Sequence, residues 1–233
     1  MIRDICRKIL PPEVRWWIKK VFLKKYSGER NYLYHDSAPK FGTTEHTHWN
    51  LYNLALSYIP TGASVLDVGC GSGFGSYLIS QKAEKVVALD YSKAAINFAK
   101  KNNQAKNVDF ILSNIDDFDY QEKFDVVVMI EFLEHNVQPK SVLKRITCLL
   151  KEEGMMIISL PVFPDGVPLK RGWHFHEFTD SRFRDVFKDY NYKVYGLKNL
   201  AFVEIDFSNG NFKEFFSESL EAASTYFVIV KKT

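Results

Sequence analysis

The chain has 233 residues and a mass of 27.0 kDa. Hydrophobic side chains make up 46% and aromatic ones 15%, which supports one large folded domain and excludes a disordered chain. No apolar run approaches the roughly 18 residues that a bilayer-spanning helix needs, and the first residues lack the apolar segment of a secretory signal. The cysteines are odd in number and far apart, which favours neither a disulfide framework nor a zinc site. We therefore expect a cytoplasmic protein, with reduced thiols at Cys6, Cys70 and Cys148.

The net charge of +3 is unevenly distributed along the chain. Residues 1–25 hold eight lysines and arginines against two acids, so they carry +6 and the other 208 residues carry −3. A protein whose main task is to bind a nucleic-acid backbone more often spreads cations over its fold. We therefore expect a small-molecule partner rather than a nucleic acid.

The basic segment predicts an amphipathic helix within residues 1–26, before a polar, aromatic-rich cap at 27–60 and a main domain at 61–233. Pro12 suits the first turn of a helix. Residues 12–26 then carry one apolar stripe at helical spacing, formed by Val14, Trp17, Ile18, Val21 and Phe22. Such a helix can lie in an anionic membrane interface, at the inner face of the membrane. It can equally pack on the domain or on a second subunit.

From residue 61 onwards short apolar runs alternate with stretches of helical spacing. The runs indicate strands at 64–68, 86–89, 108–112, 124–130 and 155–160, and the helical stretches lie at 75–81, 93–103 and 139–150. This alternation predicts a parallel sheet with helices on both faces. The strands are apolar throughout, as strands covered on both faces are. A helix near 180–190, a strand near 193–203 and a last strand at 225–231 complete the pattern.

A glycine-rich turn follows the first predicted strand, in the sequence VLDVGCGSGFG at 65–75. Such a turn brings backbone close to a ligand and aims helix N–H groups at it. A dinucleotide-binding turn has glycines at its first, third and sixth positions, but the sixth position here is Phe74 or Ser76, depending on the starting glycine. Asp67 stands before the turn and would repel a pyrophosphate. The segment suits a cofactor that carries an amine and no phosphate.

Two further strand ends carry polar groups. Asp90 ends the second strand, 21 residues after Gly69, which is the usual separation for a carboxylate that binds ribose hydroxyls; the alternative is an acid favoured by a helix dipole. After the third strand, Ile115 and Asp116 could frame an adenine and accept from its amine. The alternative there is an ordinary turn.

At these residues the chain resembles the class I S-adenosylmethionine-dependent methyltransferases. Five motifs occur in the family's order, namely VLDVGCGSG, VVALDYS, SNIDD, FDVVVMIEFLEH and LLKEEGMMIISLP. The resemblance implies a Rossmann-like, doubly wound, seven-stranded α/β sheet, mostly parallel, with an antiparallel C-terminal edge strand beside the fifth parallel strand. It implies that S-adenosyl-L-methionine is bound through its methionine part, its ribose and its adenine by Asp67, Gly69, Cys70, Gly71, Asp90, Tyr91, Asn114, Ile115 and Asp116.

The candidate catalytic residues are Glu131, Glu134 and His135, which follow the fourth strand at the edge where open α/β sheets bind ligands. An alcohol acceptor must lose a proton, which requires a base or a metal. Together with His174 these residues could hold Mg²⁺ or Mn²⁺, a pattern similar to that of metal-dependent O-methyltransferases acting on quinone precursors and on the terminal ribose of small RNAs. Alternatively, Glu131 closes the cofactor site and His135 is a metal-free base or a structural histidine.

The leading hypothesis is a methyltransferase acting on an oxygen of a small molecule, a sugar or a lipid-linked glycan. Residues 173–179 and the pair Glu45–His46 resemble stretches of methyltransferases from glycan and secondary-metabolite gene clusters, where His46 or Trp49 would cover the cofactor. The alternative is that His46 is an ordinary surface histidine. One alternative is a methyltransferase for the 2′-oxygen of a terminal RNA ribose. Another is a non-catalytic cofactor-binding subunit that recruits a partner enzyme. The glycine spacing disfavours a nicotinamide oxidoreductase.

Overall fold

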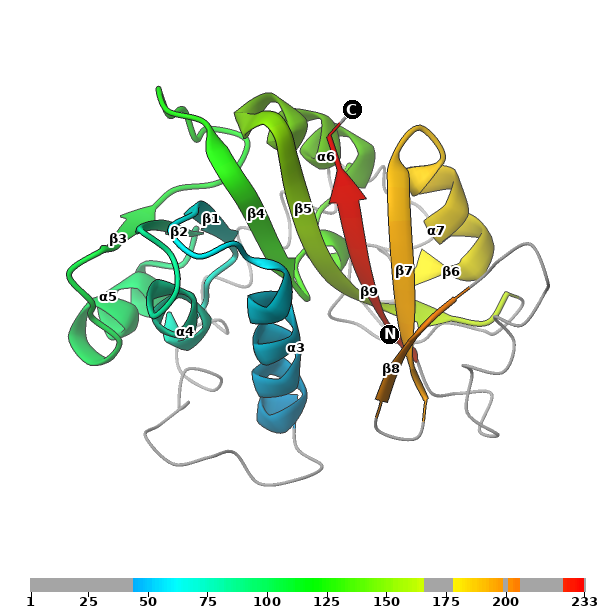
Figure 1. The fold of residues 1–233 in the computed structure, drawn as a ribbon, viewed down its shortest axis with the longest axis horizontal. Helices are drawn as coiled ribbons and strands as arrows, with labels where there is room; N and C mark the ends of the chain where they lie inside the picture. The colour runs from blue at the N-terminus through cyan, green and yellow to red at the C-terminus, as the bar shows by residue number, and fades with distance from the viewer. Residues whose placement is uncertain (1–43, 166–177, 199–200, 206–223, 233) are drawn as a thin grey trace, which may run out of the picture.

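The computed structural model describes residues 44–165, 178–198, 201–205 and 224–232, which form one sheet covered by helices on both faces (Figure 1). The order of the strands is β3-β2-β1-β4-β5-β9-β7-β8, and β6 pairs with β5 beside this path. The parallel strands are β1 (Ser64–Val68), β2 (Lys85–Asp90), β3 (Val108–Leu112), β4 (Phe124–Ile130), β5 (Leu150–Phe163) and the short β6 (Phe178–Thr179). The antiparallel strands are β7 (Asn191–Lys198), β8 (Ala201–Glu204) and β9 (Ser224–Lys231).

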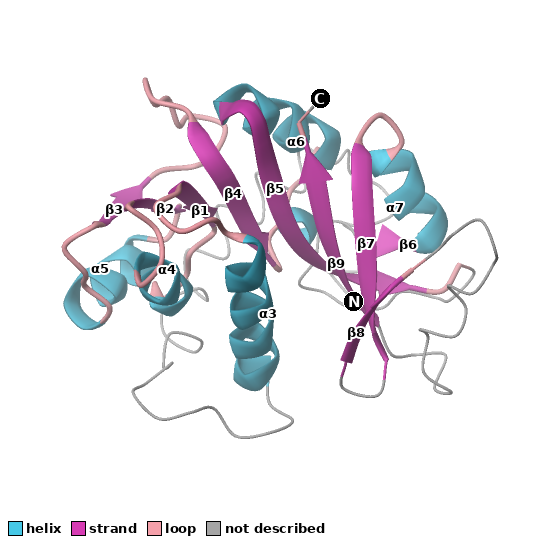
Figure 2. Cartoon of the chain, viewed as in Figure 1, coloured by secondary structure: helices cyan, strands magenta, loops and turns pink. Residues whose placement is uncertain are grey.

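The helices fall into two groups, one on each face of the sheet (Figure 2). Their bounds are α3 (Thr44–Tyr58), α4 (Phe74–Ser80), α5 (Lys93–Asn102), α6 (Pro139–Leu149) and α7 (Asp180–Phe187), with the 3₁₀ turn η2 (Leu133–His135) after β4. Alternate residues of the central strands point to opposite faces. Val65 and Val128 therefore pack with α3 and α4, whereas Leu66 and Val127 pack with α6 and α7.

The predicted fold class is confirmed, and the strands 64–68, 108–112 and 124–130 have the predicted bounds. The sheet has nine strands rather than the expected seven. One reason is that the strand predicted near 193–203 is a hairpin of β7 and β8; the other is the additional pair of residues in β6. The predicted antiparallel pairing of the last strand with β5 is present from Met155↔Lys231 to Val162↔Ser224.

The position of β9 differs from the expected sheet edge. It lies between β5 and β7, because β7 and β8 extend the sheet beyond it. The residues from Tyr226 to Val230 are all buried, as expected for an interior strand covered on both faces.

The cap predicted at 27–60 contains α3, whose apolar residues Leu51 and Ala55 are buried against the sheet and α4, as is Ile59 directly after the helix. Residues 1–43 lie outside the described part of the chain, and with them the basic helix predicted within 12–26. Among the helices that the structure describes, none combines the length and the apolar character needed to cross a membrane.

Candidate active site

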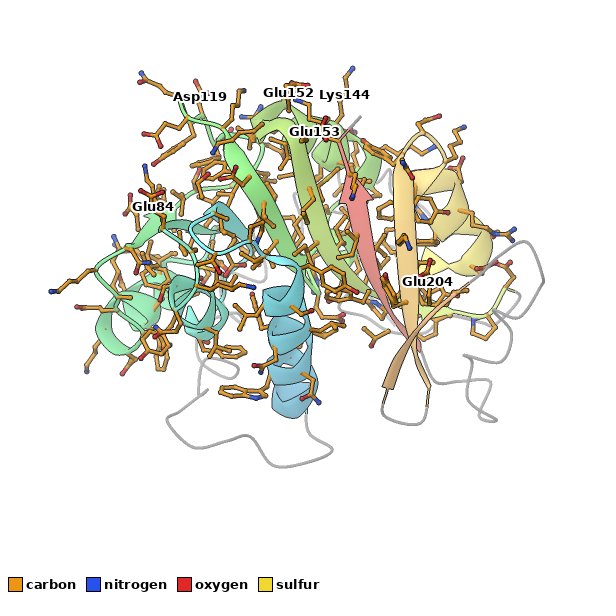
Figure 3. All side chains as sticks on the ribbon, viewed as in Figure 1. Glu84, Asp119, Lys144, Glu152, Glu153 and Glu204 are labelled. Atoms are coloured by element: carbon orange, nitrogen blue, oxygen red, sulfur yellow. The ribbon has the colours of Figure 1, made fainter. Side chains whose placement is uncertain are left out.

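The predicted site residues that the structure describes lie at or just after the carboxyl ends of β1, β2, β3 and β4. The first three strands of the chain run outward in the order β1, β2, β3, whereas β4 lies on the other side of β1. This reversal is the switch point at which open α/β sheets bind ligands. Charged side chains such as Asp119, Glu152 and Glu153 lie at the opposite edge, near the starts of β4 and β5 (Figure 3).

The glycine-rich turn connects β1 to α4 through three left-handed residues. Gly69, Gly71 and Gly73 have φ values of +77°, +53° and +81°, a backbone conformation that glycine adopts without steric cost. A Cβ on Gly71 would meet no heavy atom of the described residues within 4 Å, so open space lies over this residue in that part of the structure. A Cβ on Gly69 would lie 2.5 Å from the ring of Phe132. Gly71 therefore leaves room for a ligand, and Gly69 leaves room for Phe132.

Asp67 is completely buried beneath this turn. Its two carboxylate oxygens accept hydrogen bonds from Tyr52 Oη, at 3.2 Å, and from Ser76 Oγ, at 2.6 Å. Burial raises the pKa of Asp67 to about 6, although both hydroxyls favour the ionised form; the nearby Asp90 raises it further. Buried acids with raised pKa values are typical of functional sites.

The carboxylate of Asp90 faces the same turn from the end of β2. Its oxygens accept from the backbone N–H groups of Gly71, at 2.9 Å, and Ser92, at 2.8 Å. Desolvation raises the pKa of Asp90, and these two bonds oppose that effect. Each oxygen keeps a second acceptor site, so the carboxylate is fixed in orientation and can still accept from two ligand hydroxyls.

The remaining predicted cofactor residues divide into buried and exposed ones. Cys70 and Ile115 are 4% and 2% exposed and pack in hydrophobic clusters of the core, so their side chains support the loops. Tyr91 is 75% exposed beside Asp90. Asn114 and Asp116 form a turn closed by a hydrogen bond from the Asp116 N–H to Asn114 Oδ1, at 3.4 Å.

Glu131 stands at the end of β4 in a left-handed conformation, with φ of 50°. Such a conformation is uncommon for a residue other than glycine and occurs often at functional sites. The backbone N–H of Glu131 donates to Ser159 on β5, and Ser159 Oγ donates to Glu131 Oε1 at 3.0 Å. Desolvation raises the pKa of Glu131 to about 7 despite this last bond, so the carboxyl can exchange a proton near neutral pH.

Glu134 and His135 are adjacent but differ in exposure. Glu134 is fully buried, and neither of its carboxylate oxygens accepts a hydrogen bond within the described part of the chain. Its pKa is raised well above the ordinary value, first by desolvation and then by the charge of Glu131. The side chain of His135 is 47% exposed, and its Nε2 lies 3.8 Å from Glu134 Oε1.

The predicted metal set is not assembled by the residues that the structure describes. In that part of the chain no three His, Cys, Asp or Glu side chains converge as metal ligands. The carboxylate of Glu134, which accepts no hydrogen bond within the described part of the chain, would suit a cation, but the predicted ligand His174 lies outside the described residues.

Phe132 connects the two halves of the site, because its ring lies against Gly69 of the glycine-rich turn. The sequence EFLEH at 131–135 is thereby placed directly beside the predicted cofactor turn. The sequence analysis did not identify Phe132, nor the hydroxyl groups of Tyr52, Ser76 and Ser159 that hold the buried acids. Of the predicted lid residues, Trp49 stacks on Phe74 with ring centroids 6.0 Å apart.

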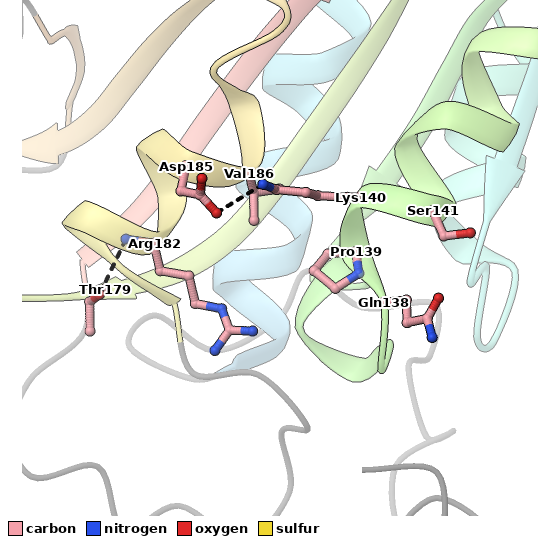
Figure 4. A pocket seen from close by; sticks show the side chains of 8 residues that line it. All are labelled: Gln138, Pro139, Lys140, Ser141, Thr179, Arg182, Asp185 and Val186. Carbon is pink, nitrogen blue, oxygen red and sulfur yellow. Dashed lines mark hydrogen bonds and ion pairs between the residues drawn. The ribbon is translucent and has the colours of Figure 1, made fainter.

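A groove of about 750 Å³ lies between the starts of α6 and α7 (Figure 4). Helix α6 begins a few residues after η2, and α7 follows β6, which pairs with the carboxyl end of β5. The groove therefore lies at the same carboxyl edge of the sheet as the catalytic segment. The residues that line it are mostly polar, namely Gln138, Pro139, Lys140, Ser141, Thr179, Arg182, Asp185 and Val186.

An open sheet with a glycine-rich turn and a strand-end carboxylate at its switch point defines a nucleotide-cofactor-binding protein of the Rossmann-like class. A family model described as "Methyltransferase domain" matches residues 59–220. The chain therefore belongs to the methyltransferase domain family and is of the class I S-adenosylmethionine-dependent type, as its motifs predicted.

Relatives and solved structures agree with this assignment. The chain is 33% identical over 100 residues to the ubiquinone biosynthesis O-methyltransferase of Bradyrhizobium diazoefficiens, a match covering 42% of this chain and 40% of that protein. The chain spans about half the length of the curated relatives it matches. Its fold is similar to that of the YcgJ protein of Bacillus subtilis, with a TM-score of 0.61, 14% identity and coverage of 79% and 99%. It is also similar to the N-methyltransferase NodS of Bradyrhizobium japonicum with bound S-adenosylhomocysteine, with a TM-score of 0.57, 14% identity and coverage of 84% and 92%.

Proposed function

We propose that this protein transfers the methyl group of S-adenosylmethionine to a hydroxyl oxygen of a small molecule. The observation that carries the proposal is the contact of Phe132 with Gly69, which places Glu131, Glu134 and His135 against the glycine-rich turn. The relatives named as O-methyltransferases of ubiquinone biosynthesis support oxygen as the acceptor atom.

In this proposal the cofactor lies along the carboxyl ends of β1 and β2. Asp67 faces the ammonium of the methionine part, the space over Gly71 receives that part, and Asp90 accepts from both ribose hydroxyls. Tyr91 and the turn at Asn114 and Asp116 flank the adenine. Each of these residues either faces the turn or follows the strand end beside it.

The protein contributes to catalysis in two ways: it aligns the acceptor oxygen with the methyl group, and it removes the proton of the acceptor hydroxyl. Methyl transfer from a sulfonium requires the acceptor oxygen to be held in line, about 3 Å from the methyl carbon. The neutral imidazole of His135 takes the hydroxyl proton, with Glu134 behind it, and Glu131 closes the cofactor site.

The acceptor is proposed to reach the site along the groove between α6 and α7. The lysine, arginine, amide and hydroxyl side chains that line it suit a hydroxylated ring, a sugar or a lipid-linked glycan. An anchoring role of residues 12–26 at an anionic membrane surface would suit an acceptor with a lipid tail and remains a prediction from the sequence.

The test begins with calorimetric titration of the purified full chain with S-adenosylmethionine, S-adenosylhomocysteine and NAD. Binding of the first two and no binding of NAD are expected. Transfer of a labelled methyl group is then measured on a phenol, a sugar, an aromatic amine and a short RNA. Labelling of the amine alone would contradict oxygen transfer, salt-sensitive labelling of the RNA would favour the ribose alternative, and binding without turnover on any acceptor would favour the non-catalytic subunit.

Metal dependence is tested with the same assay. If His135 is a metal-free base, chelators leave turnover unchanged, and the rate rises with pH through the histidine pKa of about 6.5, because only neutral imidazole accepts a proton. His135→Gln should flatten that profile. Loss of activity on chelation, with recovery on adding Mg²⁺ or Mn²⁺, would instead establish the metal set that was predicted with His174.

A further inference from the structure

The acid beneath the glycine-rich turn is held by a tyrosine from outside the family match. Tyr52 belongs to α3, before the matched residues 59–220, and is only 5% exposed. Its ring lies over α4 at Gly75, where a Cβ would come within 2.1 Å of the ring. A glycine at position 75 is therefore what lets the ring reach this place, and the hydroxyl then donates to Asp67 Oδ1 at 3.2 Å.

The charged form of Asp67 is stabilised by hydroxyl groups from two separate helices, α3 and α4. Ser76 of α4 donates to its second oxygen at 2.6 Å. The other groups around Asp67 do not favour its charge: Asp90 on β2 is a second acid, Cys70 is a buried thiol, and β4 places Val128 beside it in the sheet. A buried carboxylate without hydrogen bonds takes up a proton, so the two hydroxyls maintain the charged form.

We propose that Tyr52 is a positioning residue for the cofactor, whose hydroxyl keeps Asp67 an oriented carboxylate facing the cofactor's ammonium group. The docking of α3 on α4 thereby determines whether the cofactor site is competent. This inference rests on the proposed function, because it takes Asp67 as the partner of the methionine part.

One substitution distinguishes the effect of the Tyr52 hydroxyl from that of its ring. The ring of Tyr52 packs edge-on against Phe74, with centroids 5.2 Å apart, and a phenylalanine retains this contact and the packing over Gly75. Tyr52→Phe therefore keeps α3 docked and removes only the hydrogen bond to Asp67. Tyr58→Phe is the matched control, because Tyr58 lies on the same helix but contacts Tyr195 and Phe227 instead.

The experiment is calorimetric titration of the full chain with S-adenosylhomocysteine at pH 5.5 and at pH 8. Protonation of Asp67 removes the charge that faces the ammonium, so affinity falls on acidification. Loss of one hydrogen bond to a charged acceptor moves the midpoint of this fall upward by about one pH unit. From a starting pKa of about 6, Tyr52→Phe should bind about eightfold more weakly than wild type at pH 5.5 and almost equally at pH 8. Tyr58→Phe should match wild type at both.

A second probe tests the ammonium directly. Methylthioadenosine has the nucleoside but no amino-acid part, so Tyr52→Phe should bind it as wild type does at both pH values. Equal S-adenosylhomocysteine affinities for Tyr52→Phe and wild type at pH 5.5, or the same weakening at both pH values, would overturn the inference while leaving the proposed function intact. Failure of wild type itself to bind S-adenosylhomocysteine at pH 8 would overturn the proposed function.

Discussion

Replacing Asp67 by asparagine should stabilise the cofactor-free protein and at the same time weaken cofactor binding. The group is completely buried, and burial raises its pKa from the usual value near 4 to about 6. An acid that binds its proton more tightly in the folded state lowers the free energy of unfolding as the pH rises between those two values. About two pH units correspond to about 3 kcal/mol, and this loss is complete above pH 6.

Asparagine does not titrate, and its amide can still exchange hydrogen bonds with the hydroxyls of Tyr52 and Ser76. Near pH 4 the folded wild-type protein has Asp67 protonated, so the variant differs from it there only by hydrogen-bond geometry. Between pH 4 and pH 7 the free energy of unfolding of Asp67→Asn should rise relative to wild type by up to about 3 kcal/mol. Titrating groups that do not interact with Asp67 are common to both proteins, and their contributions cancel in the difference.

The measurement is urea unfolding at several pH values from 4 to 7.5, with calorimetric titration of S-adenosylhomocysteine in parallel. Affinity should fall by about 1.5–3 kcal/mol, because the ammonium loses a charged acceptor. Asp109→Asn, at an exposed position of β3, is the matched control and should follow wild type at every pH. A stability difference between Asp67→Asn and wild type that does not change with pH would refute the reasoning.

Three further predictions concern cofactor binding and the basic segment. Asp90→Ala should weaken S-adenosylhomocysteine binding by about 1.5–3 kcal/mol, since the ribose loses a charged acceptor; unchanged affinity in calorimetry would remove Asp90 from the site. Gly71→Val should abolish this binding in a protein that still unfolds cooperatively, because the side chain would occupy the open space over the turn; normal binding would show that the methionine part lies elsewhere. Deletion of residues 1–25 should leave cofactor affinity intact and reduce sedimentation with anionic vesicles, each cation contributing about 1 kcal/mol; equal sedimentation would favour a helix packed on protein.

The central fold could be predicted because its strands are short, wholly apolar and separated by helical spacing. The site acids Asp67 and Asp90 could also be predicted from the sequence, because they directly end or follow apolar runs. The hairpin of β7 and β8 was not visible, because the segment 193–203 has no strong turn sequence to divide it. Helix α3 could have been found from Leu51 and Ala55, which with Ile59 directly after the helix recur every four residues.

The directions of the side chains in the segment 131–135 could not be predicted from the sequence. The spacing of Glu131, Glu134 and His135 suggested three groups facing one point. In the structure the left-handed backbone at Glu131 and the 3₁₀ turn after it send Glu134 inward, while His135 is half exposed. Neither feature has a sequence signal here.

Asp125, at the amino edge of the sheet, and the acids of the candidate site, at the carboxyl edge, differ in their partners, and this contrast favours a cationic ligand. At the amino edge, partial burial works against the charge of Asp125, but hydrogen bonds from Lys151 and Ser64 outweigh it and lower its pKa. At the carboxyl edge no lysine or arginine of the described residues pairs with Asp67, Asp90 or Glu131, and the pKa of each is raised. Buried acids without cationic partners cost stability, and such a cost is often retained where function needs it. S-adenosylmethionine carries both an ammonium and a sulfonium, so its binding would supply the positive charge that this edge of the sheet lacks.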